Sequence, residues 1–362
     1  MGNTGLVSVV YEWHINPRFS VAPRISYRQT KDDYRYFRHD LSRARSQHEG
    51  YSFSSEIHAN WQTGVGNLGL GLEMRKEAIE SSNIGDHERN NYGAYVEFRK
   101  EWANFSMNVG SYVNYNSVYG WQAFPGVDAG WKLTQNLKWT AHAGMSQRIP
   151  SFTDLYLNQL PGNLGNPNVL PEEAWQMETG FKYTGRQSIA QAHYFYRNID
   201  QFIDWVYEKG TNPPYQPMNF DQNKVHGISF SADQWLGDTE THSGIWRLGI
   251  QYTYLRPSYT LDGAGKYQSK YSTETLRQQL TGQITYQNGD ALFSTTARFQ
   301  ERMSYKKYAL FDMRYTHCWD PVELSLMVQN LFNVQYMEAA AAPMPGRGVS
   351  LSVAYAMPFK KW

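Results

Sequence analysis

The sequence predicts an all-β protein built from antiparallel strands, and three observations support this. Apolar and polar residues alternate along most of the 362 residues. No segment longer than about three turns shows a helical period. The connections between these segments are alternately short and long along the chain. Because side chains of a strand point to opposite faces in turn, each segment has one apolar and one polar face.

The alternation is clearest at 174–183, where Trp175 and Met177 share one face and Gln176 and Glu178 the other. The same pattern recurs, in order along the chain, at 247–255, 322–329 and 349–355. Seventeen strands are expected in all, at 5–13, 18–29, 46–61, 65–79, 89–99, 103–117, 122–133, 137–148, 171–183, 187–207, 217–236, 244–256, 273–286, 291–303, 307–317, 321–331 and 346–357.

The lengths of the connections indicate a membrane barrel rather than a soluble sandwich. Every second connection is short, with a mean of about four residues, and the others average about twelve. An up-and-down sheet places alternate connections at opposite ends, so one end of the sheet carries the short turns and the other carries the long loops. Outer-membrane barrels have this asymmetry. Most of the expected strands also reach the ~9–11 residues that a tilted strand needs to cross the hydrocarbon.

The tryptophans favour the same interpretation. Of the twelve, eight lie within about three residues of a short turn, and a ninth ends the chain. They are Trp13, Trp61, Trp102, Trp131, Trp139, Trp235, Trp246, Trp319 and Trp362. Indole rings prefer the membrane–water interface, so this distribution predicts an aromatic girdle at the end with the short turns. Simple core packing, the alternative, gives no reason for clustering at one end.

Composition excludes several other classes of protein. The net charge of +1 gives no footprint for nucleic acid, and the single cysteine, Cys318, allows neither an internal disulfide nor a zinc pair. A mean hydropathy of −0.63 suits a barrel whose strands expose only one face to lipid. Seventeen is an odd number, whereas bacterial single-chain barrels have even numbers of strands. With no signal peptide visible, we expect the C-terminal part of a longer precursor, unless one hairpin is miscounted.

Three stretches resemble TonB-dependent outer-membrane receptors. They are RIPSFTDLYLNQLPGNLGNPNVLPEEAWQMETGFKY (148–183), YFYRNIDQFIDWV (194–206) and VQNLFNVQYMEAAAAPMPGRGVSLSVAYAMPF (328–359), spaced as in that family. The sequence around 34–45 and the segment SKYSTETLRQQL (269–280) most resemble cobalamin-receptor-type members of Bacteroidetes.

The resemblance implies a barrel of 22 strands around an N-terminal plug. Residues 1–362 would then be the C-terminal part of the barrel, strands 6 to 22, without the plug and the first five strands. It further implies a location in the Gram-negative outer membrane in contact with its lipid, energy from the TonB complex through the missing plug, and recognition of the closing strand by the barrel-assembly machinery. The terminal signal is either Phe359 or Trp362, and a surface lipoprotein is an open further partner.

The implied function is active import of a large, scarce nutrient, with cobalamin or another corrinoid favoured over a ferric siderophore. Ligand capture would use aromatic and basic side chains of the long loops. The candidates are Tyr34, Arg35, Tyr36, Arg38, Phe152, Tyr156, Trp205, Tyr207, Tyr215, Tyr267 and Tyr305. An outer aromatic girdle would need similar residues at the same height. The Ser151–Asp154 pair predicts one helical turn that shapes a loop.

Other functions stay open at this point. No hydrolase, zinc-protease or phosphate-loop motif occurs, no cofactor is implied, and the ten histidines are scattered singly, so neither a catalytic nor a metal site is expected. His142 and His193 fall on polar strand faces and should point into the lumen. A passive porin-like channel and a β-barrel enzyme or adhesin are the alternatives, with a soluble sandwich more remote.

Overall fold

The computed structural model describes residues 2–35, 37, 39–40, 45–212, 214–238, 243–260, 266–270, 276–303, 306–338 and 342–356. It contains one short helix, α1 (Phe152–Tyr156), among strands. The strands are β1 (Gly2–Val10), β2 (Trp13–Asn16), β3 (Phe19–Arg35), β4 (Arg45–Gln62), β5 (Asn67–Ser81), β6 (His87–Glu101), β7 (Phe105–Asn116), β8 (Gly120–Lys132), β9 (Leu137–Arg148), β10 (Asn158–Gln159), β11 (Asn163–Leu164), β12 (Glu172–Thr184), β13 (Ser188–Glu208), β14 (Gln216–Asp238), β15 (Ser243–Thr260), β16 (Tyr267–Ser269), β17 (Leu276–Asn288), β18 (Ala291–Arg302), β19 (Tyr308–Trp319), β20 (Val322–Gln329) and β21 (Gly348–Tyr355).

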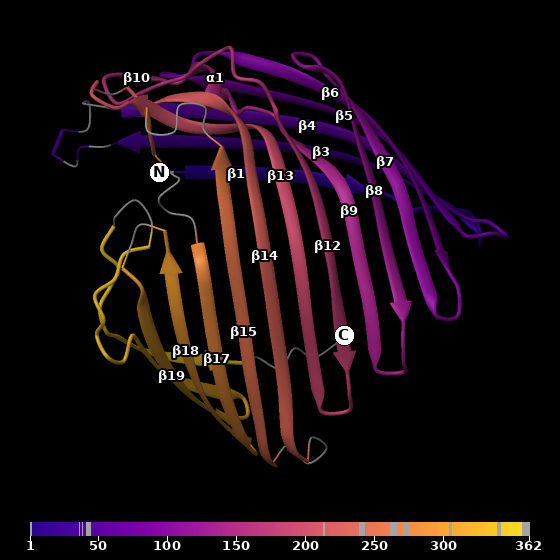
Figure 1. Cartoon of the computed structure of the whole chain (residues 1–362), viewed down its shortest axis with the longest axis vertical. Helices are drawn as coiled ribbons and strands as arrows, with labels where there is room; N and C mark the ends of the chain where they lie inside the picture. Colours follow the sequence, from indigo (N-terminus) through magenta and orange to yellow (C-terminus); the bar gives the residue numbers. More distant parts are fainter. Residues whose placement is uncertain are drawn as a thin grey trace.

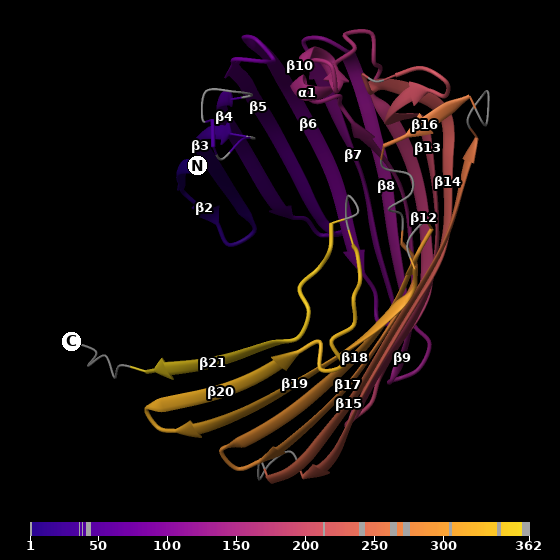
Figure 2. The ribbon, with the colours of Figure 1, turned by 90° about the vertical axis from the view of Figure 1, so that its left-hand side faces the viewer.

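Nineteen of the strands form one curved antiparallel sheet in which each wall strand pairs with the next along the chain (Figures 1 and 2), and β10 and β11 form a separate two-stranded sheet. This confirms the predicted all-β fold and its seventeen wall strands, with two additions to the sheet. The expected first strand is divided into β1 and β2, and β16 lies within a long loop. In the described part of the chain, β1 pairs with β3 alone and β21 with β20 alone, so both are edge strands.

Pro23 explains the division of the first strand. Val10 pairs with Arg24 and Trp13 with Val21, which places Tyr11 opposite Pro23. The carbonyl of Pro23 accepts a hydrogen bond from the Tyr11 N–H over 3.1 Å, but proline has no N–H to return. The ladder is therefore interrupted at Tyr11, where an unbroken strand over 5–13 was predicted.

The two faces of the sheet differ as the alternation predicts. On β12, Trp175, Met177 and Phe181 are exposed on the outer face, in register with Tyr196 and other outward residues of β13. Few apolar side chains are buried anywhere in the described residues. The one packed cluster consists of Leu155, Val169 and Ile203, against which Tyr156 packs. It lies beside α1, so the packed core sits at one end of the sheet rather than in its middle.

The long connections lie at the α1 end and the short turns at the other (Figure 1). Trp61, Trp102, Trp131 and Trp319 are exposed at the ends of their strands beside short turns, in agreement with the predicted girdle. Trp235 is an exception. It pairs with Arg247, whose guanidinium lies 5.5 Å from the indole ring on the inner face. Its neighbour Gln234 occupies the outward position, so nearness to a turn does not determine on which face of the sheet a tryptophan lies. Trp362 lies outside the described residues.

Candidate functional site

Asp154 is the centre of a buried polar network at the loop end of the sheet. Ser151 caps α1: its hydroxyl accepts from the Asp154 N–H (3.1 Å), and its own N–H donates to Asp154 Oδ2 (3.0 Å). This confirms the predicted helical turn and its capping box. Arg148 Nη1 also donates to Asp154 Oδ2 (3.2 Å), and the indole N–H of Trp205 donates to Oδ1 (2.9 Å). Asp154 is 6% exposed, so its carboxylate needs these donors.

Glu172 extends the network to the wall. Arg148 Nη2 donates to Glu172 Oε1 (3.0 Å), and the same oxygen accepts from the Ile203 N–H (2.8 Å). One arginine therefore joins two buried carboxylates, one on the α1 loop and one at the start of β12. The arrangement fixes α1 against β12 and β13, which is a supporting role.

Phe152 and Tyr156 pack against the wall rather than into open space. The imidazole of His87 stacks on the Tyr156 ring with centroids 3.6 Å apart. The Arg89 guanidinium lies 4.7 Å from the Phe152 centroid, and its Nη1 donates to the Pro150 carbonyl (2.7 Å). These contacts hold α1 from its second side, over β6.

A strap formed around β16 completes the rim. The strap consists of residues 266–270 and pairs with the end of β13 through Val206 and Ser269. The Ser269 hydroxyl donates a short hydrogen bond to Asp204. Burial raises the pKa of Asp204, while this hydrogen bond lowers it by a smaller amount. Lys270 Nζ donates to Asn163 Oδ1 (2.8 Å).

Three of the predicted site residues meet around the strap. Lys270 Nζ lies 5.6 Å from the Trp205 ring and 5.5 Å from that of Tyr215. Tyr215 meets Tyr207 edge to face with centroids 4.9 Å apart. Burial lowers the pKa of Lys270 and raises that of Tyr215. Trp205 is only 8% exposed, so its ring supports the strap, whereas Tyr207 and Tyr215 are less buried.

Of the other candidates, one belongs to the strap itself, two end β3, and three lie outside the described residues. Tyr267 belongs to the strap and meets Phe220 edge to face at 6.2 Å. Tyr34 and Arg35 end β3, where Asp33 accepts from both Arg35 (2.6 Å) and Arg45 (2.9 Å). These two arginines hold the pKa of Asp33 well below its usual range. Tyr36, Arg38 and Tyr305 lie outside the described residues.

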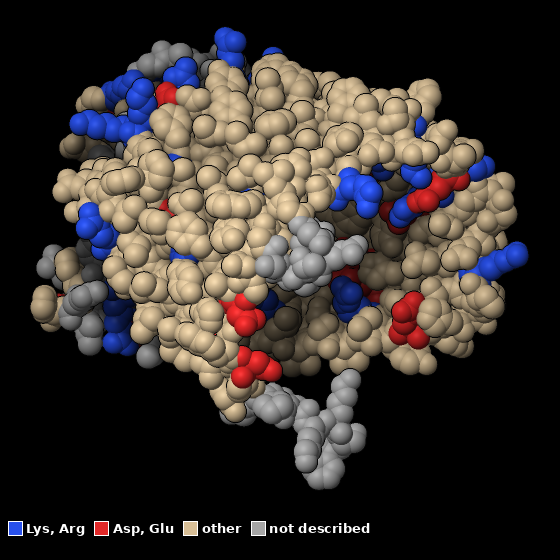
Figure 3. All heavy atoms as spheres, turned by 90° about the horizontal axis from the view of Figure 1, so that it is seen from below, with Lys and Arg blue, Asp and Glu red and all other residues tan. Residues whose placement is uncertain are grey.

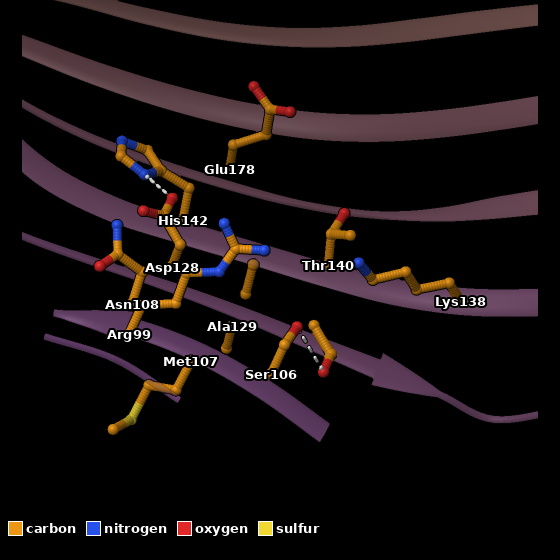
Figure 4. Close-up of a pocket in the computed structure, with 12 residues that line it drawn as sticks. Arg99, Ser106, Met107, Asn108, Asp128, Ala129, Lys138, Thr140, His142 and Glu178 are labelled. Carbon is orange, nitrogen blue, oxygen red and sulfur yellow. Dashed lines mark hydrogen bonds and ion pairs between the residues drawn. The ribbon is translucent and has the colours of Figure 1, made fainter. Parts of the chain in front are cut away.

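The inner face of the sheet carries a polar hollow of about 320 Å³ (Figure 4). Arg99, Lys138, Asp128 and His142 line it, and His142 Nδ1 lies 2.7 Å from Asp128 Oδ1. From below, acidic and basic side chains gather around the opening on this side of the molecule (Figure 3). His142 thus lies on the inner face as predicted, and so does His193, 2.9 Å from Glu178. Both histidines face carboxylates, and among the described residues no three His, Cys, Asp or Glu side chains are grouped to hold a metal ion.

Asp204 and Lys270 were not singled out from the sequence, although they tie down the strap. Lys270 lies inside the 269–280 stretch that carried part of the family resemblance, which was the available signal. Asp204 lies in an apolar run between Ile203 and Trp205. A single carboxylate in such a run indicates a buried acid that needs a hydrogen-bond donor from elsewhere in the fold. The described part of the chain holds no helix long and apolar enough to cross a membrane.

Comparison with known proteins supports the observed fold and identifies a protein-family model that the chain matches. The model of the β-barrel of TonB-dependent receptor-like proteins matches residues 2–331. The vitamin B12 transporter BtuB of Photobacterium profundum is 28% identical over 183 residues, which is 48% of this chain and 30% of that protein. The match therefore covers less than a third of that relative's length.

Solved structures of low identity share the fold. The copper transporter OprC superposes with a TM-score of 0.79 at 15% identity, covering 98% of this chain and 65% of OprC. The ferric enterobactin receptor PfeA of Pseudomonas aeruginosa gives 0.79 at 15% identity, covering 97% of this chain and 61% of the receptor. The siderophore receptor PirA of Acinetobacter baumannii gives 0.76 at 14% identity, covering 98% and 62%.

Proposed function

Because this chain belongs to the TonB-dependent receptor family through its β-barrel, which lies in the outer membrane of Gram-negative bacteria, we propose that it forms the wall of an active importer for a large, scarce nutrient. The observation that carries the proposal is the aromatic and cationic rim, in which Tyr207, Tyr215 and Lys270 converge at the loop end of a polar-lined sheet. Aromatic rings offer large contact area at a low cost in side-chain entropy, which suits a bulky ligand.

The wall described above would be the C-terminal part of a larger closed barrel of 22 strands with a plug. The unpaired edges of β1 and β21 support this, because an open edge in lipid leaves backbone groups unsatisfied at several kcal/mol each. Energy would come from TonB through the plug. The barrel-assembly machinery would recognise the closing strand, whose residues Phe359 and Trp362 lie outside the described residues. A surface lipoprotein is a further proposed partner.

A corrinoid is the favoured ligand and a ferric siderophore the second. The relative named as a vitamin B12 transporter supports the first, and the receptor named for ferric enterobactin supports the second. Tyr34, Arg35, Phe152, Tyr156, Trp205 and Tyr267 remain proposed ligand contacts, as do Tyr36, Arg38 and Tyr305, which lie outside the described residues.

Uptake of labelled cyanocobalamin by cells that make the natural protein tests the proposal. Replacing Tyr207 and Tyr215 with alanine should reduce uptake at least tenfold, whereas the matched change Tyr183→Ala on the outer face should leave it unchanged. A protonophore should abolish uptake, because TonB draws on the inner-membrane gradient. Uptake that survives the protonophore would point to a passive channel, and uptake of ferric enterobactin alone would establish the second ligand. Chemical alteration of the ligand by the purified protein would favour an enzyme.

A further inference from the structure

A second hollow, of about 430 Å³, lies on the opposite face of the sheet, across β13, β14 and β15. Tyr194, His226, Tyr254 and Arg256 line it, with Ile228 at its apolar side. Nothing in the proposed import function uses this face.

The register shows that the hollow faces outward. His226 of β14 pairs with Tyr196 of β13 and Arg256 of β15, so the three side chains share one face. Two residues further along β14, Ile228 is 50% exposed on the same face. The intervening Gly227 belongs to the inner face, where an added Cβ would meet the ring of Phe195.

The length of the apolar, lipid-facing part of β15 indicates the depth of the hollow in the membrane. Outward positions of β15 run from Trp246 through Leu248 and Ile250 to Tyr254 without a charge. This nine-residue segment matches the ~9–11 residues that a tilted strand needs to cross the hydrocarbon. Arg256, the next outward residue, therefore lies at the interface on the loop side, beside the tyrosines that favour this depth.

The charge of the hollow is positive. Arg256 of β15 lines the hollow, and Lys224, the next outward residue of β14 after His226, lies beside it. Neither side chain makes an ion pair or hydrogen bond with the described residues. His226 is fixed by the Tyr194 hydroxyl, 2.7 Å from its Nδ1, and packs against Tyr196 with centroids 4.7 Å apart. The hollow itself is lined by no acid.

An acidic residue, Asp200, lies further along the outer face on the loop side of the hollow, and its carboxylate already accepts a hydrogen bond. Asp200 is the outward residue of β13 beyond Asn198, whose amide donates to Asp200 Oδ1 over 3.0 Å. It pairs in the ladder with Gln222, two residues beyond Lys224, and so lies further from the apolar, lipid-facing part of the sheet than the hollow does. Two cations and a histidine therefore border a tyrosine-lined depression at the membrane surface.

We propose that this hollow binds the phosphate headgroup of an outer-leaflet lipid. A guanidinium and an ammonium donate charge-assisted hydrogen bonds to phosphate oxygens, and Nε2 of His226 adds a further donor when protonated. The acyl chains of the same lipid would lie along Ile228, Phe230 and Ile250 below it. The proposal rests on the outer-membrane location of the family and is independent of which nutrient the barrel carries.

Binding of short-chain phosphatidic acid to the full chain in detergent tests the proposal, with short-chain phosphatidylcholine and inorganic phosphate as comparison probes. The double change Lys224→Gln and Arg256→Gln should weaken phosphatidic acid binding at least tenfold. The matched control Lys209→Gln removes a positive charge at the same end, beyond the last residue of β13 and not next to a lining residue of the hollow, and should change nothing. Arg256→Lys alone should keep most of the binding, because it keeps the charge.

The outcomes separate the sources of the phosphate. Saturable phosphatidic acid binding that the double variant loses, with weak binding of the other two probes, supports the lipid site. Inorganic phosphate that competes at the same concentration would show a free-anion site and overturn it, as would equal binding by the double variant. The shift of the folded barrel on an unheated electrophoresis gel shows that each variant is folded, and nutrient uptake is not part of the readout.

Discussion

The indole N–H of Trp205 donates to Oδ1 of Asp154 over 2.9 Å, with both side chains buried. This bond joins the far end of β13 to a five-residue helix that is too short to be stable alone. The rim of the sheet therefore depends on one carboxylate that four donors share: the Arg148 guanidinium, the Ser151 N–H and hydroxyl, and the Trp205 indole.

Asp154→Ala should destabilise the rim by about 2 kcal/mol or more, because it leaves the buried Trp205 indole N–H without its acceptor and removes the acceptor of the Arg148 and Ser151 donors. The measurement is hydrogen exchange of the α1 segment in detergent, where protection should fall. Thr153→Ala, on the exposed side of the same helix, is the control and should preserve protection. Equal protection in both variants would show that the network contributes nothing.

Lys270→Met should release the strap. The substitution removes the bond to Asn163 and the positive charge beside Trp205 and Tyr215, while keeping an apolar chain of similar length. We expect cleavage within 266–270 by a limiting amount of protease to become several-fold faster. Lys266→Met is the matched change at the other end of the strap, where the ammonium reaches Glu208 at the surface, and it should alter cleavage little. Identical rates for the two variants would contradict the assignment.

Docking of the strap should weaken as pH rises, through Asp204. Its pKa is raised by burial above the ordinary 3.8, so the docked state holds the proton more firmly than the open state. The stabilisation is complete below about pH 3.8 and is lost as pH rises through the raised pKa. Asp204→Asn, which cannot ionise, should make the exchange rates of 266–270 independent of pH after correction for intrinsic chemistry. A wild-type profile already free of pH dependence would refute this.

Gly71→Ala should disturb the inner wall. A Cβ at Gly71 would lie 2.0 Å from Tyr95 Cε1, and the Tyr95 hydroxyl is 3.1 Å from His58 Nδ1. Moving the ring should cost about 1–3 kcal/mol by overpacking. The change should lower the urea midpoint of unfolding, whereas Gly282→Ala, with nothing within 4 Å of the added Cβ, should leave the midpoint in place. A shared midpoint would mean that the ring yields without cost.

The period of the side chains made the wall predictable. Outward Trp175 and inward Glu178 follow from alternation alone, since a shift of one residue would turn every side chain of the strand over. The cause of the interruption at Tyr11, Pro23, was equally present in the sequence, but recognising it required the register, which places Tyr11 opposite that proline. Trp235 shows the limit of a positional argument, because its nearness to a turn says nothing about the face on which it lies.

The rim was less predictable because its contacts join distant segments. Trp205 was chosen as a ligand-binding aromatic, yet its ring is buried under Lys270 and beside α1. Local patterns found the Ser151–Asp154 cap, whose partners are three residues apart. The hydrogen bonds from Ser269 to Asp204 and from Lys270 to Asn163 join segments 65 and 107 residues apart in the chain, and no local periodicity encodes them.

The pairing of β16 with β13 has a consequence for the order of assembly. Val206 and Ser269 are separated along the chain by two complete wall strands, β14 and β15. Closing so long a segment in an unfolded chain carries a large entropy loss, which falls once β14 and β15 have joined their neighbours. Nearest-neighbour hairpins should thus form first and the strap last. Folding of this protein would proceed from the wall to the rim, with the loop end the last part to gain its structure.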